Sequence, residues 1–419
     1  MNTMRRLAFL LVLFLAQAAV AENWPGFRGP TRQGVSTETG LPTRWSATEN
    51  VAWKTTIPGS GWSSPIVWNE HIFLTTAMDE GTSFRVLALD RRSGTILWNK
   101  EVFRQELTQK QPPNSYATPT PATDGRRVYV LSFNGKIAAL SFDGQVEWTN
   151  TEVDYYSQHG LAVSPVLHEG LLIIPFDGSS RGEDKTVGWQ KPWEEAFILA
   201  LDCNTGKVRW RAKRGPSRIA HVTPNILGTG EDAQLVSGAG DVVQGFDLAT
   251  GERIWSVRSE GEGVVPSVVI GDDLVYTASG FGNPTIRAMR PGSRQDPDRA
   301  QVVWEQSKNV PSIPSFILDG KHLFSISQDG IAMAMDATSG EIVWRERIGG
   351  KHSASPILAD GRIWFLSEEG ESAIVSAKPP FDVVARNSID EKCQASYAVS
   401  QGQIFIRSAS HLYCIGSKD

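Results

Sequence analysis

Cysteine is scarce in this sequence of 419 residues, which contains Cys203, Cys393 and Cys414 and no others. Three cysteines are too few for a disulfide framework, so the fold must rest on a packed core. Cys414 falls in a predicted strand, and Cys393 comes just before a strand two places away in the same sheet. Two strand spacings are about 9–10 Å, whereas a disulfide needs Cα atoms within about 7 Å. The sequence leaves open whether these two residues pair.

An excess of positive charge is also missing. Lysine and arginine number 41 against 46 aspartates and glutamates, the formal net charge is −5, and no basic run follows residue 6. Binding to phosphate backbones depends on clustered basic residues, so we expect no nucleic-acid partner.

Long apolar runs are absent beyond the first 21 residues, so we expect no transmembrane segment. Residues 1–21 combine Arg5 and Arg6, a short apolar run over residues 7–15, and Ala19-Val20-Ala21. This pattern predicts a cleavable signal peptide with cleavage after Ala21, and a periplasmic or secreted protein. The alternative is a retained N-terminal anchor.

One eleven-residue pattern recurs along the rest of the chain. ALDRRSGTILW at 88–98 returns as ALDCNTGKVRW at 200–210, GFDLATGERIW at 245–255 and AMDATSGEIVW at 334–344. A period of about 40–60 residues fits the four-stranded blade of a propeller. The tryptophans that we expect to dock neighbouring blades together are Trp53, Trp98, Trp148, Trp210, Trp255, Trp304 and Trp344.

Each period contains short runs rich in β-branched and aromatic residues, separated by turn pairs such as Asp124-Gly125. We name the strands of a blade A to D from the centre outward. The first strands are marked by Pro65, Pro119, Pro165, Pro224, Pro266, Pro314 and Pro356, with Tyr397 in the eighth copy. The eighth copy lacks a fourth strand, and a spare strand at 50–57 precedes the first blade. We expect this strand to complete the last blade and close the ring.

The sequence therefore predicts an all-β protein, an eight-bladed β-propeller of four-stranded antiparallel blades closed by an N-terminal strand. Its parts are a signal peptide (1–21), an N-terminal extension (22–49) and the propeller (50–419).

The recurring motif has a physical reading. Asp90 can bond turn donors, Gly94 supplies positive φ, and Trp98 offers an apolar face and an N–H group to a neighbouring blade. Blade 7 carries Ala385 where the other blades have tryptophan. We expect a weaker blade contact there.

The motif resembles the tryptophan-docking motif of eight-bladed quinoprotein propellers, over nearly all of residues 50–416. The opening NWPGFRGPTRQGVS is similar to secreted PQQ-like repeat proteins of planctomycete-type bacteria. The resemblance implies kinship with pyrroloquinoline quinone (PQQ) alcohol dehydrogenases and with non-enzymatic BamB-type outer-membrane assembly factors. The dehydrogenases use PQQ, calcium and usually an adjacent cysteine pair, and this sequence has no such pair. Fold likeness alone assigns no function.

Residues that enter the A strands should meet at the mouth of the central channel, where propellers bind ligands. The expected channel-mouth residues are Trp62, Tyr116, His159, Arg218, His221, His352 and Gln394. Aromatic and imidazole groups in a concave mouth suit ligand binding. The alternative is that they plug the channel. We expect no metal site. The alternative is a zinc ion bound by His159, His221 and His352.

A long insertion between strands B and C of blade 3, residues 177–196, is the second candidate region. We expect it to cover the mouth or to meet a partner. Its candidate residues are Arg181, Glu183, Asp184, Lys185 and Trp189. The basic stretch at 213–221, with Arg214 and Arg218, either meets an anionic ligand or pairs with the acidic insertion.

Taken together, these features indicate an exported binding or assembly scaffold that recognises a ligand or protein partner at the channel mouth, and we expect a monomer. The alternatives are a PQQ-dependent oxidoreductase and an extracellular carbohydrate-binding module. We expect no cofactor, PQQ with calcium being the alternative, and no catalytic residue can be assigned.

Overall fold

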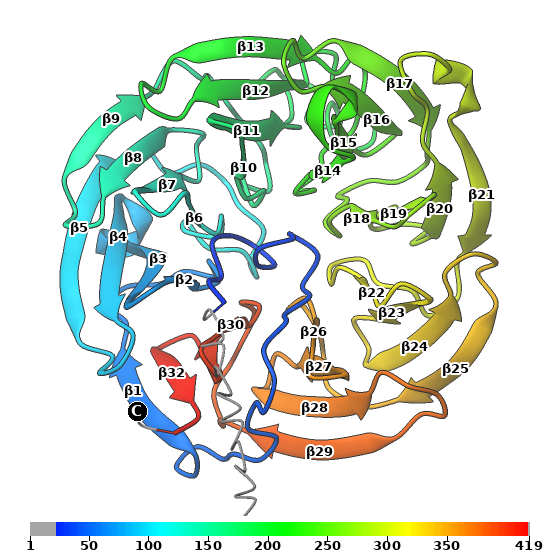
Figure 1. The fold of residues 1–419 in the computed structure, drawn as a ribbon. Helices are drawn as coiled ribbons and strands as arrows, with labels where there is room; N and C mark the ends of the chain where they lie inside the picture. Colours follow the sequence, from blue (N-terminus) through cyan, green and yellow to red (C-terminus); the bar gives the residue numbers. More distant parts are fainter. Residues whose placement is uncertain (1–21, 418–419) are drawn as a thin grey trace, which may run out of the picture.

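The computed structural model describes residues 22–417, which form a ring of eight four-stranded antiparallel sheets (Figure 1). This confirms the predicted all-β, eight-bladed propeller. The strands are interrupted only by short 3₁₀ turns at η1 (Asp79–Gly81), η2 (Gly230–Asp232) and η3 (Pro297–Arg299) in this part of the chain. Between residues 22 and 417, no helix has the length and apolar character needed to span a bilayer. The predicted signal peptide lies outside the described residues.

Each blade runs from its A strand at the channel to its D strand at the rim. Blade 1 comprises β2 (Ile66–Trp68), β3 (His71–Met78), β4 (Ser83–Asp90) and β5 (Ile96–Arg104), and blade 2 comprises β6 (Ala122–Thr123), β7 (Arg127–Leu131), β8 (Ile137–Ser141) and β9 (Val146–Asn150). Blade 3 comprises β10 (Val166–His168), β11 (Leu171–Phe176), β12 (Phe197–Asp202) and β13 (Val208–Lys213), and blade 4 comprises β14 (Asn225–Leu227), β15 (Gln234–Gly238), β16 (Val242–Asp247) and β17 (Arg253–Arg258).

The second half of the ring follows the same order. Blade 5 comprises β18 (Val269–Ile270), β19 (Val275–Ala278), β20 (Ile286–Arg290) and β21 (Gln301–Gln306), and blade 6 comprises β22 (Ile317–Leu318), β23 (His322–Ile326), β24 (Ile331–Asp336) and β25 (Ile342–Arg347). Blade 7 comprises β26 (Ile357–Ala359), β27 (Arg362–Leu366), β28 (Glu371–Ser376) and β29 (Val383–Ser388), and blade 8 comprises β30 (Ala398–Ser400), β31 (Gln403–Arg407), β32 (His411–Ile415) and β1 (Val51–Thr56).

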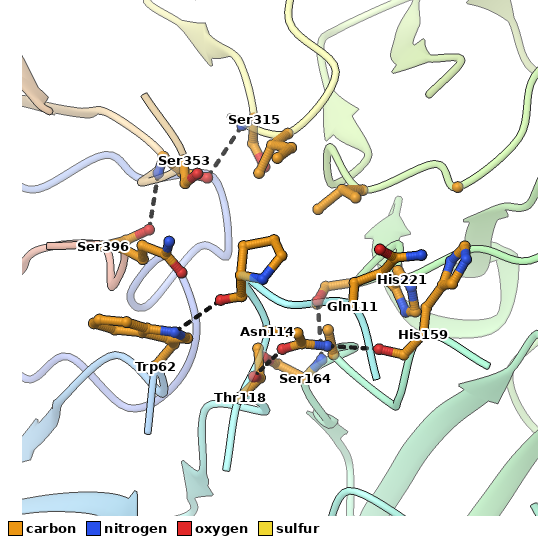
Figure 2. A pocket seen from close by; sticks show the side chains of 18 of the residues that line it. Trp62, Gln111, Asn114, Thr118, His159, Ser164, His221, Ser315, Ser353 and Ser396 are labelled. Atoms are coloured by element: carbon orange, nitrogen blue, oxygen red, sulfur yellow. Dashed lines mark hydrogen bonds between the residues drawn. The ribbon is translucent and has the colours of Figure 1, made fainter. Parts of the chain in front are cut away.

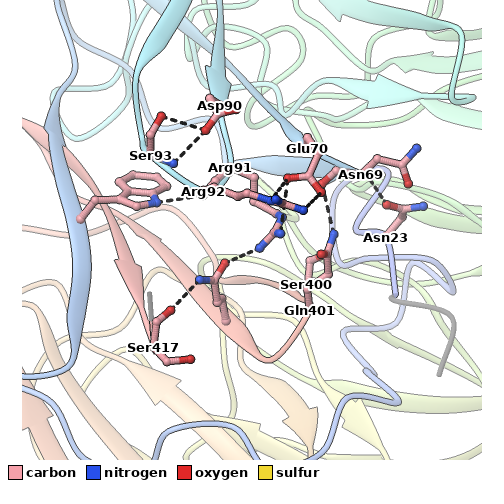
Figure 3. A network of polar contacts seen from close by, with 12 residues as sticks. Asn23, Asn69, Glu70, Asp90, Arg91, Arg92, Ser93, Ser400, Gln401 and Ser417 are labelled. Carbon is pink, nitrogen blue, oxygen red and sulfur yellow. Dashed lines mark hydrogen bonds and ion pairs between the residues drawn. The ribbon is translucent and has the colours of Figure 1, made fainter. Parts of the chain in front are cut away.

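The ring closes as predicted, because β1 pairs antiparallel with β32. Trp53 lies opposite Cys414 and Lys54 opposite Tyr413. A polar network ties the junction to blade 1 (Figure 3): Arg91 Nη1 donates to Gln403 Oε1 at 2.6 Å. The first and the last strands of the propeller thus share one sheet, so no strand edge is left unpaired at the junction. The structure contains no disulfide between Cys393 and Cys414.

The burial pattern follows the layered packing of blades. Strands B and C lie between neighbouring blades, so β3 and β4 are buried over most of their length. Strand β5, at the rim, consists of half-buried and exposed residues apart from the buried Phe103, as expected where one face meets water.

The glycine and the tryptophan of the recurring motif meet across the blade boundary. Trp98 Nε1 donates to the carbonyl of Phe142 in blade 2 at 2.8 Å. A β-carbon added at Gly144 would lie 2.9 Å from Trp98 Cδ2, so only glycine leaves room for the ring. The same seating joins Trp53 to Gly94, Trp148 to Gly206, Trp210 to Gly251 and Trp304 to Gly340.

Two motif tryptophans depart from this pattern. Trp255 Nε1 donates to Gln234 Oε1 of its own blade at 2.7 Å. The ring of Trp344 packs against Phe381, with centroids 4.9 Å apart.

The contact after blade 7, where Ala385 replaces the motif tryptophan, is filled from outside the repeat. Trp45 of the N-terminal extension is buried and stacks on Trp364, with ring centroids 5.9 Å apart. Asn387 Oδ1 accepts a hydrogen bond from the Trp45 backbone N–H at 2.9 Å. Ala385 packs against the same apolar cluster, so its small side chain accommodates a tryptophan from elsewhere in the chain.

The first part of the extension crosses the ring (Figure 1). Residues 22–38, which we call the plug segment, bond to the A-strand ends of several blades. Trp24 N donates to Val67 O at 2.8 Å, Ile270 N to Gln33 Oε1 at 2.6 Å, and Ser36 N to Leu358 O at 2.9 Å. The plug segment therefore covers the face that carries the A–B turns, and the face with the D–A and B–C loops, which we call the mouth face, lies opposite.

Candidate functional site

The centre of the ring is a cavity of about 590 Å³, lined by side chains from the inner strands and the mouth-face loops (Figure 2). Phe27 of the plug segment is among its lining residues and forms its floor. The volume falls within the range of small-molecule pockets, about 300–1,000 Å³. The plug segment thus makes the channel a blind cavity that opens toward the mouth face.

A belt of hydroxyl groups fixes the wall of this cavity. At the start of seven A strands, a backbone N–H donates to the serine or threonine hydroxyl of the next blade. The pairs are Ser64–Thr120, Thr120–Ser164, Ser164–Thr223, Ser267–Ser315, Ser315–Ser355, Ser355–Ser396 and Ser396–Ser64. Blades 4 and 5 are joined differently: His221 N donates to Val264 O at 2.7 Å. The belt therefore opens beside His221.

The belt also sets which residue of each blade reaches the mouth, and in blade 2 this residue is Thr118 rather than the expected Tyr116. The residues two places before the belt all line the cavity: Trp62, Thr118, Ala162, His221, Val265, Ile313, Ser353 and Gln394. Blade 2 contains both Pro119 and Pro121, and the second follows its belt residue. Tyr116 therefore precedes Thr118, the residue of blade 2 that lines the cavity. Its ring packs against Phe133, with centroids 4.9 Å apart, outside the cavity lining.

Two other expected mouth residues also lie outside the lining. The His352 ring nitrogens lie 3.0 Å from Leu366 O and 2.9 Å from Gly349 O, so its imidazole is engaged by backbone. Arg218 Nη2 lies 2.7 Å from Asp241 Oδ1, and its Nη1 lies 3.5 Å from Glu262. The structure thus brings Trp62, His159, His221 and Gln394 together at the cavity and leaves Tyr116, Arg218 and His352 out.

The blade 3 insertion lies between β11 and β12, as predicted, and folds toward the mouth. Ile219 N donates to Gly188 O at 2.6 Å, and Trp193 N donates to Ser217 O at 2.8 Å. Trp189 lines the cavity, with its ring 4.7 Å from the ring of His159. Arg181, Glu183, Asp184 and Lys185 are exposed on the outer side of the insertion.

A buried ion pair anchors the base of the insertion. Arg214 Nε lies 2.5 Å from Asp177 Oδ1, and both side chains are buried. Burial raises the pKa of Asp177 to about 6, although the guanidinium of Arg214 opposes this. Arg214 therefore pairs with the insertion, the second of the two alternatives for the basic stretch.

Within the loop over residues 105–117, the sequence analysis singled out Tyr116 but missed the residues that line the cavity. Trp62 Nε1 donates to Pro113 O at 3.0 Å, and Asn114 Nδ2 donates to His159 O at 2.9 Å (Figure 2). Gln111, Pro113 and Asn114 line the cavity. The sequence features that could have indicated this role are the length of this D–A connection and its Pro-Pro-Asn run.

Two histidines form one wall of the cavity. The rings of His159 and His221 are 6.4 Å apart. Burial, and next the neighbouring His159, lower the pKa of His221 to about 3, and burial also lowers the pKa of His159. Both imidazoles are therefore neutral near pH 7, and each carries one donor and one acceptor nitrogen.

The lining residues do not fit PQQ with calcium. Calcium takes six to eight oxygen ligands, usually including carboxylates, and PQQ itself carries three carboxylates that need cationic partners. The residues that line the cavity include no aspartate, glutamate, lysine or arginine. Within residues 22–417, no cluster of three or more histidine, cysteine, aspartate or glutamate side chains is arranged to hold a metal ion.

Known proteins resemble this chain in sequence and fold. BamB of Yersinia pestis is 22% identical over 300 residues, which cover 68% of this chain and 67% of that protein. Quinohemoprotein alcohol dehydrogenase ADH IIB of Pseudomonas putida is 23% identical over 307 residues, but these cover 66% of this chain and 41% of the dehydrogenase. The crystal structure of BamB from Moraxella catarrhalis has the same fold, with a TM-score of 0.61, 15% identity, and coverage of 88% of this chain and 97% of that chain.

The family model for these assembly factors matches most of the ring. It covers residues 26–152, 193–298 and 239–378, so both the plug segment and blades 1 to 7 contribute to the match. The chain belongs to the family described as outer membrane protein assembly factor BamB.

Proposed function

We propose that the protein is an exported assembly scaffold that binds a protein partner on its mouth face. Family membership is the observation that carries this proposal. Export is supported by the signal-like pattern of residues 1–21.

The mouth face has the features of a recognition surface. Three loops gather on it: 105–117, the insertion 177–196 and the stretch 213–221. Leu107 and Phe281, in loops on this face, each leave 39% of their surface exposed, and the insertion adds the exposed charged residues Arg181, Glu183, Asp184 and Lys185. Apolar anchors surrounded by polar groups are the usual composition of a protein-binding surface.

The dehydrogenase alternative has weaker support in this molecule. The alcohol dehydrogenase relative is much longer than the matched region, and the cavity lacks charged ligands for the cofactor. We expect PQQ and calcium to give no alcohol-dependent dye reduction above a protein-free control. Reduction that saturates with PQQ would favour the oxidoreductase instead.

Affinity capture from envelope extracts of the native cell tests the scaffold proposal. The tagged full chain should retain a specific protein partner, and Leu107→Ser, in the loop 105–117 and outside the cavity lining, should weaken its capture. Leu97→Ser is the matched control, because Leu97 is 47% exposed on the outer strand β5. Loss of the partner in the control, with retention in Leu107→Ser, would move the interface to the rim of the propeller.

A further inference from the structure

The cavity presents several neutral side chains whose hydrogen-bonding groups are not used by the protein. The side chains of Gln111, His159, His221 and Gln394 make no hydrogen bond with the described residues 22–417. His221 is nine-tenths buried, and its Nδ1 is a buried atom without a partner in that part of the chain. Amide and neutral imidazole groups each combine a donor with an acceptor.

Aromatic side chains accompany these polar groups. Trp62, Trp189 and Phe281 line the cavity from blade 1, the blade 3 insertion and the B–C loop of blade 5. Trp62 and Trp189 are held in place: Trp62 Nε1 bonds to Pro113 O, and Trp189 packs on His159. Fixed aromatic faces with a few polar groups between them are typical of small-molecule sites.

The charge of the lining restricts the ligand. An anion or a cation in this cavity would lose water without gaining a counter-charge, since no lining residue carries a formal charge. A purely apolar ligand would leave the glutamine and histidine groups unpaired. A ligand rich in hydroxyl groups satisfies both conditions, because each hydroxyl donates and accepts and carries no charge.

We propose that the blind cavity binds a neutral carbohydrate, with one or two sugar rings held between the aromatic side chains and bonded by Gln394, Gln111 and the histidine pair. This site lies inside the ring, below the loops to which we assign the protein partner. It goes beyond the scaffold function and does not depend on it.

Titration calorimetry and intrinsic tryptophan fluorescence of the mature chain test this site. The neutral ligands are cellobiose, maltose and N,N′-diacetylchitobiose. Digalacturonic acid, which adds carboxylates to the same ring size, and the neutral tripeptide acetyl-Ala-Ala-Ala-amide are the comparison ligands. We expect saturable binding of at least one neutral disaccharide, and at least tenfold weaker binding of digalacturonic acid and the peptide.

Substitutions in the cavity lining test whether the disaccharide binds inside the cavity. Gln394→Leu and Trp189→Ala should each weaken disaccharide binding about tenfold, the effect of losing roughly 1.4 kcal/mol of contact. Gln190→Leu is the matched control, because Gln190 is an exposed glutamine beside Trp189 and outside the lining. Thermal melting of each variant checks that it is folded.

Three results would overturn the proposal: no binding of any neutral disaccharide at millimolar concentration, preference for the acid or the peptide, or binding that survives both cavity variants. Partner capture is read separately with the Leu107→Ser variant, which leaves every residue of the cavity lining unchanged. Absence of sugar binding would thus not contradict the scaffold function, and absence of partner capture would not contradict the sugar site.

Discussion

Lys54 Nζ lies 2.8 Å from Glu391 Oε1, an ion pair that joins the first strand of the ring to the segment between its last two blades. The same carboxylate accepts hydrogen bonds from Tyr413 at 2.6 Å and Ser408 at 2.5 Å. Burial works against ionisation of Glu391, but the bonds from Lys54, Ser408 and Tyr413 prevail and lower its pKa to about 2. One carboxylate thus connects β1, β32 and the entry to blade 8.

Replacing this carboxylate should weaken ring closure. We expect Glu391→Ala to lower the free energy of unfolding by about 1–3 kcal/mol, because several donors lose their acceptor. Lys54→Met should cost less than about 1 kcal/mol, since Lys54 is more than one-third exposed. Guanidinium unfolding at pH 7 measures both. The folded-state pKa is depressed, so the stabilisation is present above the unfolded pKa and is lost as pH falls from about 4.5 toward 2. An equal effect of the two variants would contradict this account.

The seating of tryptophan on glycine can be tested with a pair of alanine substitutions. Gly144 and Gly170 both have positive φ, 83° and 81°, but only Gly144 faces a neighbouring ring. We therefore expect Gly144→Ala to destabilise by about 1–3 kcal/mol more than Gly170→Ala, because Trp98 must shift. Trp98→Ala should cost about 3–5 kcal/mol as a truncation of a large packed side chain. Equal melting temperatures of the two glycine variants would show that backbone strain alone sets the cost.

The propeller fold, the number of blades and the closure of the ring could be predicted from the sequence. They could be predicted because the recurring aspartate, glycine and tryptophan make the same turn and the same contact between blades in most of the repeats. Trp45 shows the limit of that approach. Trp45 packs on Trp364 at the boundary after blade 7, but it belongs to the N-terminal extension, which does not contain the repeat. The spacing of the repeats therefore could not predict its position. The role of Gly144 as a seat for Trp98 also needed the blade packing, since the sequence indicated only its turn conformation.

Stability between pH 7 and pH 5 should report the neutral state of His221. Its folded-state pKa of about 3 is below that of an unfolded histidine, near 6.5. The unfolded chain therefore takes up a proton first as pH falls below about 6.5, and wild type should lose up to about 2 kcal/mol by pH 5. His221→Gln should lack the part of this loss that belongs to His221, whereas His159, whose pKa burial also lowers, contributes its own part in both proteins.

Wild type must be compared with His221→Gln, because Asp177 changes the stability of the protein with pH in the opposite direction. Its folded-state pKa of about 6 is raised, so its protonation favours the folded state as pH falls through 6. Melting curves of wild type and His221→Gln at pH 7.5 and 5 give the difference. Parallel losses in the two proteins would mean that His221 is protonated in the folded state.

At the mouth, the sequence indicated Trp62, His221 and Gln394 because a belt residue precedes a proline or tyrosine in those blades, and all three line the cavity. His159 also lines the cavity, although it does not occupy that position in its blade. Tyr116 lies outside the lining because blade 2 contains two candidate prolines, and the choice between them depends on the hydroxyl belt. Arg218 also lies outside the lining, where its guanidinium pairs with Asp241 and Glu262, which are distant from it in sequence.

The two parts of the N-terminal extension should differ in importance. Deletion of residues 22–38 removes the plug segment but keeps Trp45 and β1, so we expect a folded ring with a lower melting temperature. Hydrogen exchange should rise at the A–B turns of blades 1 and 8, where Asn69 and Gln401 bond to the extension. Deletion of residues 22–57 also removes Trp45 and β1, and should abolish cooperative unfolding. Identical melting of the two deletions would refute this division.

The buried pair of Asp177 and Arg214 gives the last prediction. Removing one partner leaves the other charge buried and unpaired, so Arg214→Met should destabilise by about 3–5 kcal/mol. The double variant Asp177→Leu, Arg214→Met replaces both charges with apolar groups of similar size and should recover most of that loss. Because Asp177 begins the blade 3 insertion, the single variant should also raise hydrogen exchange across residues 180–195, including the backbone bond from Ile219 to Gly188. Urea unfolding and exchange measured on the same three proteins separate these effects. If the double variant is no more stable than the single one, the other bonds of Arg214, to Ser237 and Gln244, rather than its pairing with Asp177, hold the base of the insertion.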